Sequence, residues 1–172
     1  MTGQMTATEQ RNILIESARL GRGRIKPLGE IHPQELTGLI LPGGLGVFQN
    51  LRHDLDVVQL VRGVHKQGKP IVAMCAAVVL VGECLGTESR KLRLGTANNA
   101  HVAALVKNHV RVVQASAQEC VEVNRIISTP AFLASQNLAE IQIGVEQAVQ
   151  GLRSFLGSSG REWGSAQDRE VL

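Results

Sequence analysis

The residue best suited to chemistry in this sequence is Cys75. It stands where an apolar run, 70–74, gives way to a run of small and apolar residues, 76–80, a change that is typical of a sharp strand-to-helix turn. Such a turn presents its side chain at the carboxyl end of a sheet, and the N–H groups that open the next helix favour a negative charge there. Two interpretations of Cys75 stay open: a thiolate nucleophile, or a cysteine packed in the core.

A glycine pair supplies a second turn that could serve the same site. Gly43 and Gly44 follow the apolar run 36–41, and without a Cβ their backbone can approach a substrate closely. Their N–H groups, together with that of Ala76, would form an oxyanion hole beside a Cys75 thiolate. This set suits attack on an aldehyde or acyl carbonyl, which gives a thiohemiacetal or a thioester.

The elements that must position these turns alternate between strands and helices. Helices are expected at 13–20, from 55 until Gly68, at 76–85, 98–107 and 131–156, and strands at 36–41, 71–74, 92–94, 109–114 and 120–128, the last as a hairpin near Asn124-Arg125. This order predicts an α/β fold whose parallel sheet is covered on both faces, with ligands at the carboxyl ends of the strands. We expect one domain over 1–156 and a disordered tail, rich in Gly, Ser and charge, over 157–172.

Composition excludes several classes of function. The 172 residues are 44% hydrophobic with a net charge of +3, and only three Phe and one Trp could stack on bases, so a nucleic-acid partner is not expected. The basic cluster 19–26 has no interleaved aromatic residue and is interpreted as a solvated loop. No apolar run reaches the roughly 18 residues of a membrane span, and the polar stretch 1–10 does not resemble a signal peptide.

Cofactor and metal motifs are also missing from the sequence. Three cysteines lack the C-x-x-C spacing and five histidines lack a paired spacing, so we expect a reducing compartment and no metal. The glycines at 43–46 match neither G-x-G-x-x-G nor the P-loop pattern, so no nucleotide cofactor is expected. A Rossmann-like nucleotide binder remains a third interpretation, which would require measurable affinity for NAD or ATP.

Several stretches together resemble one known family. They are RNILIESAR (11–19), LILPGGLG (39–46), QNL (49–51), QGKP (67–70), MC (74–75) and STPAF (128–132). In this order they are similar to the PfpI-type, class I glutamine-amidotransferase-like superfamily, and in particular to its ElbB-type glyoxalase branch. The resemblance implies a flavodoxin-like three-layer sandwich with a mostly parallel sheet.

The resemblance also implies an activity. In that family the cysteine matching Cys75 is the elbow nucleophile, and the Pro-Gly-Gly turn helps to form the oxyanion site. The implied reaction is the conversion of glyoxal, a small aldehyde, to glycolate without a cofactor. Glu16, Asn50 and His53 could complete the pocket, although Glu16 could instead form a surface ion pair with a neighbouring arginine, and His53 could be solvated.

Two departures from the family pattern affect these expectations. The sequence begins after the family's first strand–helix–strand unit, which carries the glutamate that hydrogen-bonds the nucleophile, so an N-terminally truncated chain is expected. Strand 36–41 would then present an unpaired apolar edge, which predicts a homo-oligomer. Val78 also stands where the family usually has proline, three residues after Cys75, which weakens the case for a rigid elbow.

The alternative to an enzyme is a non-catalytic or redox-sensing truncated homologue, in which an exposed Cys75 thiolate oxidises to sulfenic acid. For either function the expected location is the cytoplasm, or the mitochondrial matrix if the source is a vertebrate.

Overall fold

The computed structural model describes residues 12–86, 92–97, 105 and 107–157, and these belong to two compact units, 1–32 and 33–172. The first unit contains helix α1, Ile13–Leu20, and a 3-10 turn, η1, Leu28–Glu30. Helix α1 begins at Asn12, whose side-chain oxygen accepts a hydrogen bond of 3.2 Å from the Ile15 N–H. This is the usual way to satisfy the free N–H groups at a helix start.

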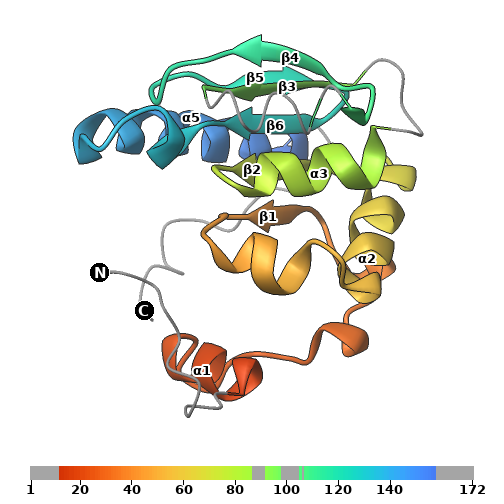
Figure 1. Cartoon of the computed structure of the whole chain (residues 1–172). Helices are drawn as coiled ribbons and strands as arrows, with labels where there is room; N and C mark the ends of the chain where they lie inside the picture. Colours follow the sequence, from red (N-terminus) through yellow and green to blue (C-terminus); the bar gives the residue numbers. More distant parts are fainter. Residues whose placement is uncertain (1–11, 87–91, 98–104, 106, 158–172) are drawn as a thin grey trace. The chain divides into compact units, whose positions relative to one another are not determined.

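The second unit is built on a four-stranded sheet, shown in Figure 1. Its strands, in spatial order, are β1 (Leu39–Leu41), β2 (Ile71–Met74), β6 (Ile126–Thr129) and β5 (Val121–Val123). The first three are parallel, whereas β5 and β6 form an antiparallel hairpin. Asn124 and Arg125 link this hairpin, both at positive φ (54° and 64°), as in a type I′ turn.

Helices and a second strand pair surround this sheet. They are α2 (Leu55–Lys66), α3 (Ala77–Leu85), α5 (Leu138–Gly157), the short turns η2 (Pro33–Glu35), η3 (Val47–Leu51) and η4 (Ala131–Leu133), and the parallel strands β3 (Arg93–Thr96) and β4 (Arg111–Gln114). The Gly95 N–H of β3 donates 2.8 Å to the Ser128 hydroxyl of β6, which ties the strand pair to the main sheet.

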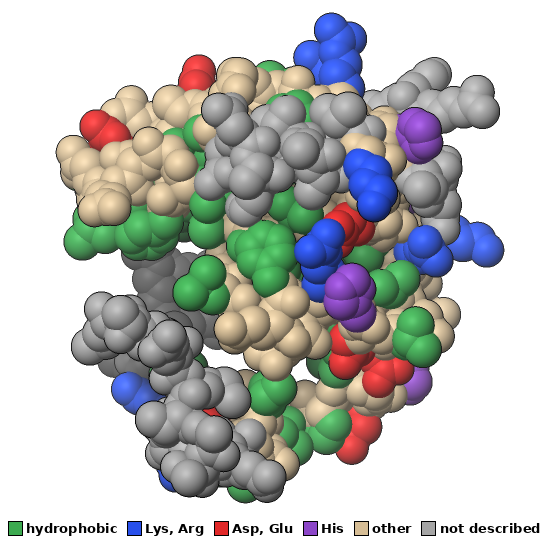
Figure 2. Space-filling model, in the orientation of Figure 1, with side chains coloured by type: hydrophobic (Ala, Val, Ile, Leu, Met, Phe, Trp, Pro, Cys, Tyr) green, Lys and Arg blue, Asp and Glu red, His purple; other side chains and the backbone are tan. Residues whose placement is uncertain are grey.

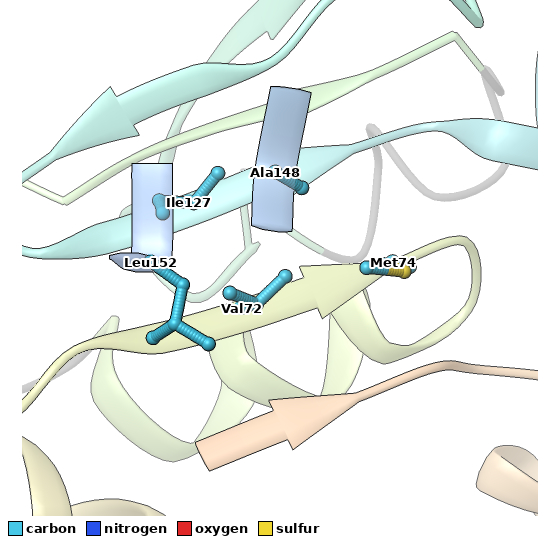
Figure 3. Close-up of a cluster of buried hydrophobic side chains, with 5 residues drawn as sticks. All are labelled: Val72, Met74, Ile127, Ala148 and Leu152. Atoms are coloured by element: carbon cyan, nitrogen blue, oxygen red, sulfur yellow. The ribbon is translucent and has the colours of Figure 1, made fainter. Parts of the chain in front are cut away.

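The core explains why α5 covers one face of the sheet. Val72 and Met74 of β2 and Ile127 of β6 point toward Ala148 and Leu152 of α5, and all five side chains are buried (Figure 3). Strand side chains alternate between faces, so Ile71 and Ala73 point to the other face, where α2 and α3 contact β2. The predicted α/β sandwich with three layers and a mostly parallel sheet is confirmed.

Two expected elements differ from those observed. The strand expected over 36–41 is paired only from Leu39, because Lys69 donates to the carbonyls of Pro33 (2.6 Å) and Gln34 (3.0 Å) and holds 33–35 as a 3-10 turn. The single helix expected over 131–156 is wrong. It divides into η4 and α5, and the Asn137 side chain accepts a hydrogen bond from the Ala139 N–H where α5 begins.

Other expectations concern residues outside the described part of the chain. Of the helix expected at 98–107, only residues 105 and 107 are described, and of the tail expected at 157–172, only Gly157, which ends α5. Within the described sheet, β1 is an end strand, and its Ile40 side chain is 45% exposed. Among the described residues, no helix combines the length and the apolarity needed to cross a membrane.

Candidate active site

Cys75 occupies the turn between β2 and α3. Its φ of 54° is left-handed, a conformation that costs a residue with a Cβ roughly 1–2 kcal/mol. The turn is held on both sides, because the Cys75 N–H donates 3.0 Å to the Thr129 carbonyl of β6 and the Cys75 carbonyl accepts from the Val78 N–H at 3.2 Å. All four residues of β2 are buried, whereas Cys75 is partly exposed. The thiol thus stands at the carboxyl end of the sheet on a strained, well-anchored residue.

The glycine turn after β1 lies directly against this elbow. Gly43 and Gly44 have φ values of 91° and 95°, a region that side chains disfavour. A Cβ added to Gly43 would lie 3.0 Å from the Cβ of Cys75 and 3.2 Å from the N atom of Ala76. A Cβ on Gly44 would have no atom within 4 Å. The structure therefore brings Gly43, Cys75 and Ala76 into contact, while Gly44 faces open space.

This arrangement can stabilise a negative charge beside the thiol. Ala76 is the N-cap of α3, so the first N–H groups of the helix lie next to Cys75. Aligned peptide dipoles make a helix N-terminus equivalent to roughly half a positive charge. An oxyanion formed by attack of the Cys75 sulfur would therefore develop close to main-chain donors.

The remaining candidate pocket residues, Glu16, Asn50 and His53, belong to other elements than the turn at Cys75. Glu16 belongs to α1 in the first unit, where its carboxylate forms an exposed ion pair with Arg19 at 3.2 Å. Asn50 is exposed on η3. His53 is also exposed, and it lines a hollow whose lining does not include Cys75.

That hollow was not anticipated from the sequence. It has a volume of about 530 Å³ and is lined by Arg52, His53, Arg62, Glu83, Lys107 and neighbouring residues. Arg52 donates two hydrogen bonds to the Glu83 carboxylate, and the bond from Nε to Oε2 is 2.6 Å long. This hydrogen bonding raises the pKa of Arg52. Arg62 Nε donates 2.9 Å to the Cys84 carbonyl. One signal was available, because Glu83 is the sole charged residue of the apolar helix α3 and such a group needs a partner.

The other two cysteines, Cys84 and Cys120, are packed against other parts of the chain. Cys84 is 2% exposed and lies in the core. Cys120 is partly buried against α5, and its thiol donates 3.1 Å to the Gly144 carbonyl. Burial raises the pKa of Cys120, because the thiolate is poorly solvated there.

Comparison with known proteins identifies the family of this fold. Residues 24–139 match the sequence model of the DJ-1/PfpI family. The chain is 30% identical over 178 residues to the human glutamine amidotransferase-like class 1 domain-containing protein 3, mitochondrial, and 26% identical over 175 residues to the rat ES1 protein homolog, mitochondrial. Each alignment covers 90% of this chain and 65% of the relative, so the chain spans about two thirds of the length of these relatives.

A solved structure is also similar to this chain. The isoprenoid biosynthesis protein with amidotransferase-like domain from Ehrlichia chaffeensis superposes with a TM-score of 0.74 at 29% identity, over 85% of this chain and 71% of that one. The fold built on the elbow at Cys75, the match over 24–139 and this superposition lead to one conclusion: the chain belongs to the DJ-1/PfpI family.

Proposed function

We propose that this chain is a cofactor-independent glyoxalase that converts glyoxal to glycolate through the thiol of Cys75. The observation that carries the proposal is the partly exposed Cys75 on a left-handed turn, with the backbone of Gly43 packed against it. Family membership supports a thiol-based site in general, and the resemblance to the ElbB-type branch directs the choice of substrate.

The reaction needs no external oxidant or reductant. The Cys75 thiolate adds to one aldehyde carbon of glyoxal, a C–S bond forms, and the carbonyl electron pair becomes an alkoxide held by the amides of Gly44 and Ala76. The hydrogen of that carbon leaves as a proton and returns to the neighbouring carbon, so the first carbon is oxidised, the second is reduced, and a glycolyl thioester results. Water then cleaves the C–S bond, which releases glycolate and restores the thiol.

The proton transfer requires a base, for which the sequence offers Glu16. Its carboxylate is paired with Arg19 in α1. The role of Glu16 can therefore be tested separately from that of Cys75. Glu16→Gln should lower kcat if the carboxylate moves the proton. Arg19→Gln is the matched control, because it breaks the same ion pair and leaves the carboxylate in place. Equal activity of Glu16→Gln and the unchanged chain would remove Glu16 from the mechanism.

The deciding experiment measures glycolate formed from glyoxal by the purified chain. Cys75→Ala should abolish turnover, whereas Cys120→Ala should retain it, because the Cys120 thiol is bonded to the Gly144 carbonyl. Turnover that survives Cys75→Ala would overturn the thiol mechanism. Absence of turnover in the unchanged chain, with Cys75 open to alkylation, would overturn the glyoxalase assignment itself.

A redox sensor is the second candidate, favoured by the partial exposure of Cys75 beside a helix N-terminus. It predicts that dilute hydrogen peroxide converts Cys75 to sulfenic acid, detected by a dimedone adduct, in a chain that does not consume glyoxal. A chain that turns over glyoxal and resists peroxide excludes this candidate.

Self-association and location complete the proposal. The exposed Ile40 on the end strand β1 supports pairing with a second copy of the chain, and a monomer in size-exclusion chromatography would contradict it. The cytoplasm is the proposed location, or the mitochondrial matrix for a vertebrate chain, as the names of the human and rat relatives suggest.

A further inference from the structure

A second place on the molecule has the properties of a binding site that the glyoxalase reaction does not use. It is the hollow of about 530 Å³ beside α2 and α3, to which Glu83 and Cys84 contribute from the last turn of α3. Within α3, Cys84 follows the first helical residue, Ala77, by seven residues, which corresponds to about 10 Å along the helix axis. The hollow and the elbow thus lie toward opposite ends of α3.

The charge of the hollow is strongly unbalanced. Three basic side chains line it, from Arg52, Arg62 and Lys107, against the one acidic side chain of Glu83. Glu83 is already held by both arms of Arg52, so its charge is compensated within the pair. Figure 2 shows basic side chains around an acidic one on this face of the molecule, over α2 and α3. A concave wall that carries excess positive charge concentrates anions from solution.

The basic groups of the hollow differ in how firmly they are held. Arg62 is anchored by its Nε to the Cys84 carbonyl, and Arg52 by Glu83, so both guanidinium groups are fixed to the wall. Lys107 and His53 are exposed at the rim. Fixed guanidinium groups suit planar or tetrahedral oxyanions, and a lysine ammonium adds a mobile point charge.

The wall also has an apolar part, formed by Val58 and the buried Cys84. A site with an apolar surface beside fixed cations favours a ligand that has both an anionic head and a carbon skeleton. We propose that this hollow binds a small organic phosphate monoester, with the phosphate toward Lys107 and Arg62 and the carbon skeleton against Val58. The proposal is independent of the chemistry at Cys75.

The test is a calorimetric titration in phosphate-free buffer at low salt, with phenyl phosphate, inorganic phosphate and uncharged phenol as probes. Phenyl phosphate should bind more tightly than inorganic phosphate, because only the ester can cover the apolar wall, and phenol should not bind measurably. The affinity for phenyl phosphate should fall as sodium chloride is added, since the contacts are charged.

Variants then locate the binding. Lys107→Gln and Arg62→Gln should each weaken phenyl phosphate binding by about tenfold, the scale of one charged hydrogen bond. Arg153→Gln is the matched control, because it removes one exposed positive charge from α5, which covers the other face of the sheet. Circular dichroism verifies that each variant is folded. If Arg62→Gln does not fold, Lys107→Gln decides the test, because Lys107 is exposed at the rim.

Three outcomes would overturn the proposal: no binding of phenyl phosphate at millimolar concentration, equal affinity in Lys107→Gln and the unchanged chain, or the same loss in Arg153→Gln. Cys75→Ala should bind phenyl phosphate as the unchanged chain does. Failure of the glyoxalase assignment therefore leaves this result unaffected. Absence of phosphate binding likewise leaves the glyoxalase assignment unaffected.

Discussion

Gly43 and Cys75 are in contact across the carboxyl end of the sheet, and the contact depends on the missing side chain of the glycine. A Cβ at position 43 would lie 2.5 Å from the Met74 carbonyl oxygen and 3.0 Å from the Cys75 Cβ. The loop after β1 can therefore lie against the loop after β2 only because the residue at position 43 ends at its Cα. This contact places the backbone of the glycine turn beside Cys75 and Ala76.

Gly43→Ala should damage both stability and the site. The left-handed φ of 91° and the contact with Met74 together should lower the free energy of unfolding by about 3 kcal/mol, measured by urea denaturation. Gly44→Ala is the matched control, because it has a similar φ of 95° and open space around its Cβ, so only about 1–2 kcal/mol should be lost. Equal losses in the two variants would show that the contact at position 43 is unimportant.

The left-handed turn at Cys75 should lower the stability of the chain while it presents the thiol. Cys75→Ala and Cys75→Gly both remove the thiol, but only glycine adopts a φ of 54° without strain. The glycine variant should therefore unfold at a higher urea concentration than the alanine variant, by about 1 kcal/mol in free energy. An alanine variant at least as stable as the glycine variant would mean that the turn is not strained.

The sequence was most informative where a local turn determines the backbone. The change from an apolar strand to small residues located the turn at Cys75, and a single pair, Asn124-Arg125, located the hairpin between β5 and β6. In each case a few consecutive residues carry the physical cause, so no distant contact was needed. The inward face of α2 depends on its packing partners: Leu55 at the start of the helix is 72% exposed, whereas Val57 and Leu60 are buried.

Features that depend on distant residues were missed. Arg52 and Glu83 are 31 positions apart, and no pattern in either segment shows that they pair or that a hollow opens beside them.

The break before α5 had a local signal in Ser135 and Asn137, whose side chains accept hydrogen bonds from the N–H groups of Asn137 and Ala139. Apolar residues at helical spacing on both sides of that break concealed it.

Cys120 should make stability fall at alkaline pH. Its pKa is raised by burial, so in the folded chain the thiol keeps its proton at a pH where the unfolded chain has lost it. The stabilisation is complete below the ordinary pKa of about 9 for an unfolded cysteine and is lost as the pH rises through the folded value. Between pH 7 and 10 the unchanged chain should therefore lose more stability than Cys120→Ala, in urea denaturation at each pH. Parallel pH profiles would contradict this assignment.

Arg52 and Glu83 should be coupled in stability, because they join η3 to α3 through a bidentate pair whose side chains are only 34% and 19% exposed. Exposed ion pairs contribute up to about 1 kcal/mol and removal of one partner from a buried pair costs about 3–5 kcal/mol, so a coupling energy of about 1–2 kcal/mol is expected here. The measurement is a double-mutant cycle of Arg52→Gln and Glu83→Gln in urea, with each variant alone and both together. Because either single change leaves a charge without its partner, the double variant should be more stable than the sum of the two losses predicts. Strict additivity would mean that the pair is solvated and that Arg52 is available to ligands in the hollow.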